Sequence, residues 1–452
     1  MIYSLLRAIA VIALRWFYSD VTVVREGDEE ESVHAGPLLV VVNHPNALVD
    51  VLMAGQAVPR RLLFTGKATL FTNPVASRLL RSIGVIPLRR AADEQGPADA
   101  GRNAQAFADI TAALRRDAAV LIFPEGRSHD EPALAPLRTG AARIALAARE
   151  VGVVALRVLP IGLVFEEKDR PRSRALAIVG QPLHLDRWPE SPDAVSRLTE
   201  ELDRRLRAVT VNYSTLDEAI RETRRVALVA ALLREPVPTV GVAESLELQM
   251  TVARAMRRLR NTQLGDADPK IAARASVLEQ RVDALQRQLD RFSISSDDIR
   301  VSPSTSPGVW FVIREVTVAL IIGPVALWGW LNHLLPFHAA TAIGKARRES
   351  RADPAMRTIV AGAAFVLTVY MVQGAIVAFV LGPWIGVAYV VSLPIAADLN
   401  FRFRDRLKRV RRRSRAFLLF RARPGLRRNI LREAEDLRRD ILDLASAVVP
   451  TQ

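Results

Sequence analysis

Residues 358–397 form a run of forty residues without a charged side chain, and this run limits the possible folds more than any other feature. At about 1.5 Å per helical residue, forty residues cover about two bilayer cores. Gly382 and Pro383 break the run. We therefore expect a hairpin of two membrane spans.

Basic residues flank this run on both sides. Residues 401–449 hold 16 Lys/Arg against 6 Asp/Glu, and the run is preceded by Lys345, Arg347, Arg348, Arg351 and Arg357. Under the positive-inside rule, both flanks face the cytoplasm. A basic block of this kind suits anionic lipid headgroups or nucleic acid. Because the apolar run lies just before it, we expect lipid headgroups and no nucleic acid.

Two further apolar stretches also favour a membrane. Residues 316–331 carry no charge but contain Gly323-Pro324. A single crossing there would place residues 1–300 outside the cell, so we expect a re-entrant segment or a short hairpin. Residues 1–19 are apolar with two arginines on roughly one helical side, which predicts a helix at the membrane interface. The alternative is an N-terminal helix that packs in the core.

Between residues 20 and 215, short β-branched runs alternate with helical patterns, which is typical of an α/β domain. The apolar runs cover residues 38–42, 62–65, 83–88, 119–123, 153–165 and 175–180. We expect a mixed, largely parallel sheet that is flanked by helices and buried on both faces.

Four regions follow the α/β domain. Residues 216–300 contain amphipathic patterns and predict a helical domain. Residues 301–308 are typical of a linker. Residues 309–400 hold the membrane-embedded segments, and residues 401–452 predict a basic helical tail.

The stretch "VVVNHPNALVDV" contains the first candidates for chemistry. A strand that ends before His44 places the imidazole at the carboxyl edge of the sheet, where α/β proteins usually bind ligands. If a helix starts near Asn46, the Asp50 carboxylate can reach back to one ring nitrogen and make the other a general base. The alternative is that His44 caps the helix and Asp50 is solvated.

Three more stretches carry candidate site residues at strand ends and turns. "GVIPLRR" leads to Arg89, and "FPEGRSHD" leads into Glu125, Gly126 and Arg127. Guanidinium groups pair bidentately with phosphate oxygens. The Glu125 carboxylate can accept a hydrogen bond from a hydroxyl or orient an arginine. In "VLPIGLVF", Pro160 indicates a strand end or edge.

In order and spacing, these four stretches resemble the four blocks of the glycerophosphate acyltransferase family, over about residues 20–215. The resemblance implies that His44 is the base and Asp50 its partner. It also implies that Pro160 sits in the block that shapes the acyl-thioester site. The resemblance further implies that Arg89, Glu125 and Gly126 contact the phosphate and glycerol of the acceptor. Arg127 lies directly beside Gly126.

Two departures point to a subgroup. Five residues, rather than the commonest four, separate His44 from Asp50, and Arg127 follows Gly126 directly. Both variants resemble glycerol-3-phosphate or dihydroxyacetone-phosphate acyltransferases that also carry a membrane-embedded C-terminal half. The extra residue leaves open only the local path between His44 and Asp50.

The resemblance implies a membrane-bound O-acyltransferase of phospholipid biosynthesis, with its catalytic domain on the cytoplasmic side of the cell membrane. The acceptor hydroxyl would give its proton to His44 and attack the thioester of acyl-CoA or acyl-carrier protein. Asp50 would stabilise the resulting imidazolium. We expect no cofactor and no metal, and the absence of cysteine agrees with transfer that skips an acyl-enzyme. The alternatives are a lysophosphatidate acyltransferase and a non-catalytic adaptor with a basic tail.

Two more side chains are candidates near the site. Lys67 follows a strand and is a candidate to bind a phosphate of the acceptor or of CoA. The alternative is that it is an ordinary surface lysine. His129 either supports the site or caps a turn.

Overall fold

The structure is a computed structural model of the 452-residue chain. It describes residues 2–25, 34–88, 103–129, 131, 133–168, 170, 172–210, 216–233, 269–301, 305–346 and 354–448. The chain divides into two compact units. The first comprises Met1–Leu216 and Ala339–Ala364, and the second comprises Asp217–His338 and Phe365–Gln452.

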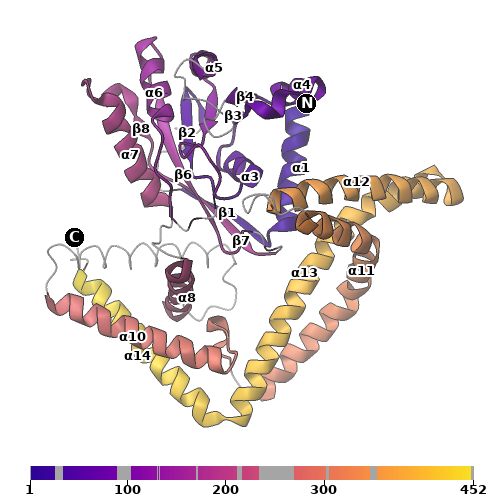
Figure 1. Ribbon diagram of the computed structural model, residues 1–452. Coiled ribbons are helices and arrows are strands. Elements are labelled where there is room, and N and C mark those ends of the chain that lie inside the picture. Colours follow the sequence, from indigo (N-terminus) through magenta and orange to yellow (C-terminus); the bar gives the residue numbers. More distant parts are fainter. Residues whose placement is uncertain are drawn as a thin grey trace. The chain divides into compact units, whose positions relative to one another are not determined.

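An eight-stranded sheet lies at the centre of the first unit (Figure 1). Its strands are β1 (Asp20–Arg25), β2 (Leu38–Val42), β3 (Leu62–Lys67), β4 (Val85–Leu88), β5 (Ala119–Ile122), β6 (Arg157–Phe165), β7 (Arg174–Val179) and β8 (Leu183–His184). They lie in the order β1-β7-β6-β2-β5-β3-β4, and β8 pairs with β6. Among these described strands, only the pairings of β6 with β7 and β8 are antiparallel. The predicted mixed, largely parallel sheet is confirmed.

Helices cover both faces of this sheet, so the central strand β2 is buried along its whole length. Its sequence Leu-Leu-Val-Val-Val therefore shows no polar alternation, because alternate residues enter two separate cores. One core contains side chains of α1 (Ile2–Phe17) and α3 (Leu48–Ala57). The other contains side chains of α5 (Ala104–Leu114), α6 (Gly140–Glu150) and α7 (Ala194–Val209). A further helix, α4 (Pro74–Ser82), lies between β3 and β4 along the chain.

The end of α1 belongs to the first of these cores. Leu14 and Phe17 are buried, and so is Tyr18, which follows the helix. This part of the N-terminal segment therefore follows the core-packed alternative. An interface location for the rest of residues 1–19 stays a prediction.

Strand β1 was not among the predicted apolar runs. Its sequence Asp-Val-Thr-Val-Val-Arg begins and ends with charges, and every residue is only half-buried because the strand lies at the edge of the sheet. Such a short mixed pattern gives a weak periodic signal.

Pro160 lies inside β6, which is an interior strand, so the prediction of a strand end or edge is wrong. The physical reason is a change of partner beside the proline. On one side, β6 pairs with β8 at Arg157 and Val158 and with β7 only from Ile161 onward. The Pro160 carbonyl accepts a hydrogen bond from the Gly180 N–H on that side, over 2.9 Å. The missing N–H of the proline therefore falls in the gap between the two partners.

The second unit is helical. Its helices are α8 (Leu216–Leu233), α10 (Pro269–Arg291), α11 (Thr305–Ala346), α12 (Pro354–Leu381), α13 (Pro383–Ala422) and α14 (Pro424–Val448), of which α11 and α12 each extend into the first unit. The side chains of α8, α10, α14 and the end of α13 share one hydrophobic core, and Figure 1 shows α10 and α14 side by side. Residues 401–448 are therefore helical as predicted, but they pack with the predicted helical domain instead of forming a separate tail.

Within the part of the chain that the structure describes, three helices are long and apolar enough to cross a membrane. They lie within Val309–Leu335, Ala364–Leu381 and Pro383–Ala422. The predicted break at Gly382-Pro383 is confirmed. Gly382 takes a positive φ of 100° between α12 and α13. Gly386 lets the two helices approach closely, because a Cβ there would lie 2.6 Å from the Cβ of Ala378.

Two predicted boundaries in this region need correction. Helix α11 runs through Gly323-Pro324 without a break, so residues 316–331 do not form a short hairpin. An apolar helix tolerates one proline because its other hydrogen bonds persist. Helix α11 also begins at Thr305, inside the predicted linker 301–308. Pro307 is compatible with this start, since the N–H groups of a first turn have no helical acceptor.

Candidate active site

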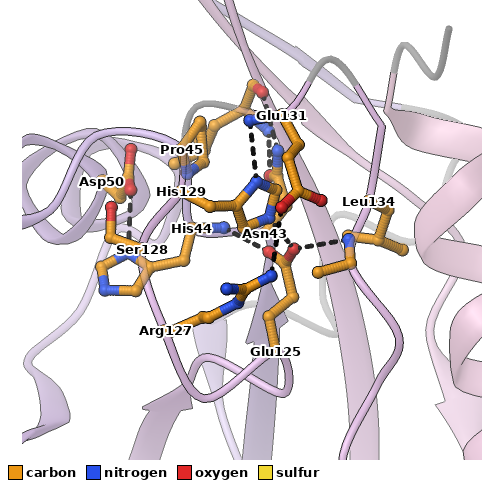
Figure 2. Close-up of polar contacts among 12 residues, drawn as sticks. Asn43, His44, Pro45, Asp50, Glu125, Arg127, Ser128, His129, Glu131 and Leu134 are labelled. Atoms are coloured by element: carbon orange, nitrogen blue, oxygen red, sulfur yellow. Dashed lines mark hydrogen bonds and ion pairs between the residues drawn. The ribbon is translucent and has the colours of Figure 1, made fainter. Parts of the chain in front are cut away.

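The first and third sequence blocks meet at the carboxyl edge of the sheet. His44 lies two residues after β2, and Glu125 lies three residues after β5. Because β2 and β5 are parallel neighbours, both loops leave the sheet at the same edge (Figure 2). The Glu125 carboxylate accepts a hydrogen bond from the His44 backbone N–H over 2.7 Å.

His44 and Asp50 form a buried pair. The His44 Nδ1 atom lies 2.9 Å from Asp50 Oδ2, and the two residues are 6% and 0% exposed. Asp50 lies in the first turn of α3, where the helix dipole favours a negative charge. A proton on Nδ1 that is donated to this carboxylate leaves the lone pair on Nε2, which is the atom that a general base needs.

Two contacts fix the orientation of this pair. The His44 ring stacks on the Phe123 ring, with centroids 3.7 Å apart and an interplanar angle of 11°. The backbone N–H of Asn46 donates to Asp50 Oδ2 over 2.7 Å. The imidazole is therefore held by the ring that directly follows β5, and the carboxylate by a backbone N–H of the turn between the two residues.

The five residues between His44 and Asp50 follow a tight turn. Ala47 has a φ of 48°, in the left-handed region that residues with a Cβ seldom adopt. Its backbone N–H donates to Ser128 Oγ over 3.2 Å. The turn takes up the additional residue while the histidine and the aspartate still meet.

Burial raises the pKa of Asp50, which is fully enclosed. The hydrogen bond from His44, the Asn46 N–H and the positive charge of Lys168 act in the opposite direction. Among the described residues, Asp50 Oδ1 and Asn46 Oδ1 are buried oxygens without a hydrogen-bond partner.

Glu125 joins the two loops of the site. It is 3% exposed, and besides the His44 N–H it accepts a hydrogen bond from the Ala135 N–H over 2.8 Å. Its second oxygen also contacts the ring Nε2 of His129. This hydrogen bond raises the pKa of His129. His129 thus contacts Glu125 of the site, and its Nδ1 also accepts a hydrogen bond from the Glu131 N–H over 3.2 Å, so it caps the following turn as well.

Asn43 extends the sheet by one residue beyond β2. Its side-chain amide donates to the Leu163 carbonyl over 3.0 Å, and its Oδ1 accepts from the Leu163 N–H over 2.7 Å. This double contact imitates a backbone pairing with β6 and sets the direction in which the chain turns toward His44. Asn43 was not among the predicted site residues, although it lies directly beside the histidine.

The other predicted site residues have different surroundings. Arg89 lies outside the described residues. Lys67 is exposed at the carboxyl end of β3, and Pro160 is buried inside β6. The Arg127 side chain is 59% exposed and pairs with Glu131 over 3.1 Å.

Gly126 has a φ of 73°, and a Cβ there would lie 2.9 Å from the Arg138 side chain. The left-handed backbone therefore favours glycine, whereas the flexible Arg138 side chain can move away from an added Cβ. Among the described residues, no group of three His, Cys, Asp or Glu side chains is placed to hold a metal ion.

Part of the chain is similar to known proteins. Residues 23–164 match the family model described as Acyltransferase. Glycerol-3-phosphate O-acyltransferase 2 of Saccharomyces cerevisiae is 33% identical over 148 residues, which are 30% of this chain and 20% of the relative. Glycerol-3-phosphate O-acyltransferase 1 of the same yeast is 30% identical over 163 residues, which are 33% of this chain and 20% of the relative. The chain thus matches about a fifth of the length of each relative.

Among solved structures, the 1-acyl-sn-glycerophosphate acyltransferase of Thermotoga maritima is similar, at 19% identity. The match covers 45% of this chain and 78% of that chain, and its TM-score of 0.33 is too low to support an argument about function. The family model and the yeast relatives both fall on the domain that carries His44, Asp50 and Glu125. Residues 23–164 therefore match an acyltransferase domain by the family model, and the yeast relatives are similar over this domain.

Proposed function

We propose that this chain transfers a fatty acyl group from a thioester to a hydroxyl of glycerol 3-phosphate or dihydroxyacetone phosphate. The thioester is acyl-CoA or acyl-carrier protein. The observation that carries the proposal is the buried contact between His44 Nδ1 and Asp50 Oδ2 at the carboxyl edge of an acyltransferase domain. It leaves Nε2 as the atom that can take a proton from an acceptor.

The reaction then proceeds without a covalent acyl-enzyme. The acceptor hydroxyl loses its proton to His44 Nε2 as its oxygen bonds to the thioester carbonyl carbon. The Asp50 carboxylate stabilises the imidazolium across the 2.9 Å contact. When the tetrahedral intermediate collapses, the carbon–sulfur bond breaks and the thiolate takes the proton from the imidazolium. The products are an ester and a free thiol, and His44 is neutral again.

Two observations support this acceptor. The two yeast relatives are both named glycerol-3-phosphate O-acyltransferases, and the sequence blocks resemble those of that subgroup. The test offers glycerol 3-phosphate, dihydroxyacetone phosphate and lysophosphatidate separately to the purified full chain with one acyl-CoA. We expect turnover with a soluble glycerol phosphate. Acylation of lysophosphatidate alone would refute the proposed acceptor and support the alternative named above.

The assay can follow the released thiol directly. Because the chain has no cysteine, a thiol-reactive dye detects only CoA. His44→Ala should abolish turnover while the protein stays folded, and His34→Ala is the matched control because His34 is an exposed histidine of the same domain. Robust activity of His44→Ala would show that His44 is not the base.

We further propose that the acceptor phosphate binds to Arg89 and Arg127, with support from Lys67. Arg127 belongs to the same loop as Glu125, and its exposed guanidinium is accessible to a substrate. Arg89→Ala should raise the Michaelis constant for glycerol 3-phosphate and leave the constant for acyl-CoA unchanged. An unaltered acceptor constant would remove Arg89 from the phosphate site.

We also propose that the acyltransferase domain and residues 401–448 both lie on the cytoplasmic side of the cell membrane. In this arrangement α12 and α13 cross the membrane as a hairpin, and α11 lies in it without crossing, because a third crossing would place the acyltransferase domain outside. The length and apolar surface of these helices support membrane association. Single cysteines introduced at the exposed Arg170 and Arg421, and at the half-buried Gly382 between α12 and α13, can be labelled with an impermeant maleimide on intact cells. Only the cysteine at position 382 should react. Labelling at position 170 would refute the proposed orientation.

A further inference from the structure

Three polar side chains from different segments meet at the turn that carries His44 and Asp50. Tyr18 follows α1, Asn46 lies within the turn, and Lys168 lies between β6 and β7. Tyr18 and Asn46 are both 0% exposed. Neither Tyr18 nor Lys168 belongs to the four sequence blocks.

The three side chains form a continuous set of hydrogen bonds. The Asn46 side-chain amide donates to the Tyr18 hydroxyl oxygen over 2.9 Å, and this hydroxyl donates to the Lys168 carbonyl over 2.9 Å. The Lys168 ammonium donates to the carbonyl oxygens of Pro45, over 2.7 Å, and His129, over 3.4 Å. The set therefore connects the loop after β2 with the loop after β5.

We propose that Lys168 is a positioning residue for the His44–Asp50 pair, and that Tyr18 and Asn46 complete this brace. The inference rests on the proposed function, because it assigns a role in the same acyl transfer. Lys168 holds the carbonyl that directly follows His44 and the carbonyl of the residue that pairs with Glu125. It thereby sets the separation between the two loops of the site.

Tyr18 connects this brace to the N-terminal helix. Its ring lies in the core under α1, with its centroid 4.9 Å from that of Phe17 and 5.6 Å from that of Phe165. Its hydroxyl is the only polar atom on this ring, and it reaches Asn46 in the turn. Removal of that one oxygen leaves the buried Asn46 amide with only its longer hydrogen bond to the Lys168 carbonyl, over 3.4 Å, which loosens the turn.

The ammonium of Lys168 also acts through its charge. The other ionisable groups that face the pair are Glu125 and His129 from the loop after β5, and the Tyr18 hydroxyl from the end of α1. The charge of Lys168 lowers the pKa of Asp50 against the effect of burial. Without it, the His44–Asp50 pair holds a proton more tightly, so the acid limb of kcat/KM moves to higher pH.

The experiment compares variants of the purified full chain in the thiol-release assay. Lys168→Met removes the charge but keeps a similar apolar stem, and Lys168→Arg restores charge and donors. Arg170→Met is the matched control, because Arg170 lies in the same turn with a 67% exposed side chain and an ion pair to Glu167. Tyr18→Phe removes only the hydroxyl. Each kcat is divided by the folded fraction from a melting curve.

We expect Lys168→Met to lower kcat about tenfold or more with both Michaelis constants nearly unchanged, because small displacements of a base slow proton transfer strongly. The acid limb of its kcat/KM profile should move to higher pH. Lys168→Arg should return this limb to its wild-type position, and Arg170→Met should match the wild type. Tyr18→Phe should lower kcat about threefold to tenfold, the factor expected for one lost buried hydrogen bond. If Lys168→Met fails to fold, Tyr18→Phe decides the outcome.

Unchanged kcat per folded molecule in Lys168→Met or Tyr18→Phe would overturn the proposal. A lower kcat of Lys168→Met with an unmoved acid limb would also overturn it, since that pattern indicates a merely structural lysine. Failure of the proposed function would look different: His44→Ala would then remain active whatever Lys168→Met does.

Discussion

Replacing Asp50 by asparagine removes one negative charge and almost nothing else. Asp50 Oδ2 accepts from both His44 Nδ1 and the Asn46 N–H. If the asparagine oxygen occupies that place, both hydrogen bonds survive but the charge that stabilises the imidazolium is lost. If the amide nitrogen occupies it, a donor faces the Asn46 N–H and His44 must keep its proton on Nε2, where it cannot act as a base.

The expected loss follows from the distance. At an effective dielectric constant of about 20, unit charges 2.9 Å apart attract each other by roughly 6 kcal/mol. This attraction develops only as His44 takes the proton, so it lowers the barrier without tightening substrate binding. The proton is only partly transferred in the transition state, and the asparagine dipole replaces part of the field. We therefore expect kcat to fall between about 10²- and about 10⁴-fold.

The thiol-release assay measures this loss, with glycerol 3-phosphate and acyl-CoA each varied to separate kcat from KM. Both Michaelis constants should stay within about twofold of the wild type, because neither substrate needs the Asp50 charge in order to bind. Because burial raises the pKa of Asp50, its charge is unfavourable in the folded state. Asp50→Asn should therefore melt no lower than the wild type near neutral pH. The wild type should lose stability relative to this variant as the pH rises above the unfolded-state value of 3.8. A variant that keeps more than about a third of wild-type kcat would refute the reasoning.

Two further predictions concern the scaffold of the site. A Cβ at Gly162 would overlap the Val209 carbonyl, so Gly162→Ala should destabilise the acyltransferase domain by about 3 kcal/mol. A Cβ at Gly55 would have no neighbouring atom within 4 Å, so Gly55→Ala should instead stabilise the domain by about 0.5–1 kcal/mol. Denaturant melts compare the two, and equal effects would contradict the packing. The hydrogen bond with Glu125 raises the pKa of His129, so the stability it adds is complete below the unfolded-state pKa and is lost as the pH rises through the folded-state pKa. The difference in melting temperature between the wild type and His129→Gln should thus be largest at about pH 6 and smallest at about pH 9. A difference that does not depend on pH would contradict the ion pair.

Much of the acyltransferase domain could be predicted because its signals are local. Strands such as β2 and β5 are continuous apolar runs, and the polar residues that end them fall at one edge whenever the strands are parallel. His44 and Asp50 lie six positions apart, so one turn suffices to bring them together. The meeting of Glu125 with this loop follows from the strand order, in which β5 lies next to β2, and the sequence did not predict that order.

The remaining parts of the site depend on contacts that no local pattern encodes. Asn43 pairs with Leu163 across 120 residues, and Tyr18 contacts Lys168 across 150. A tyrosine after an apolar helix and a lysine in a charged turn are ordinary residues until the fold brings them together. The continuity of α11 was missed for a related reason, since Gly323-Pro324 breaks helices in water more readily than in an apolar environment.

The most direct test of a base oriented by a carboxylate is a double-mutant cycle of His44→Ala and Asp50→Asn, with kcat measured for all four proteins. If Asp50 acts only through His44, the second substitution costs nothing once the first is present. We expect the double variant to equal His44→Ala within about twofold. Losses that multiply would contradict the account, because Asp50 would then contribute to catalysis independently of His44.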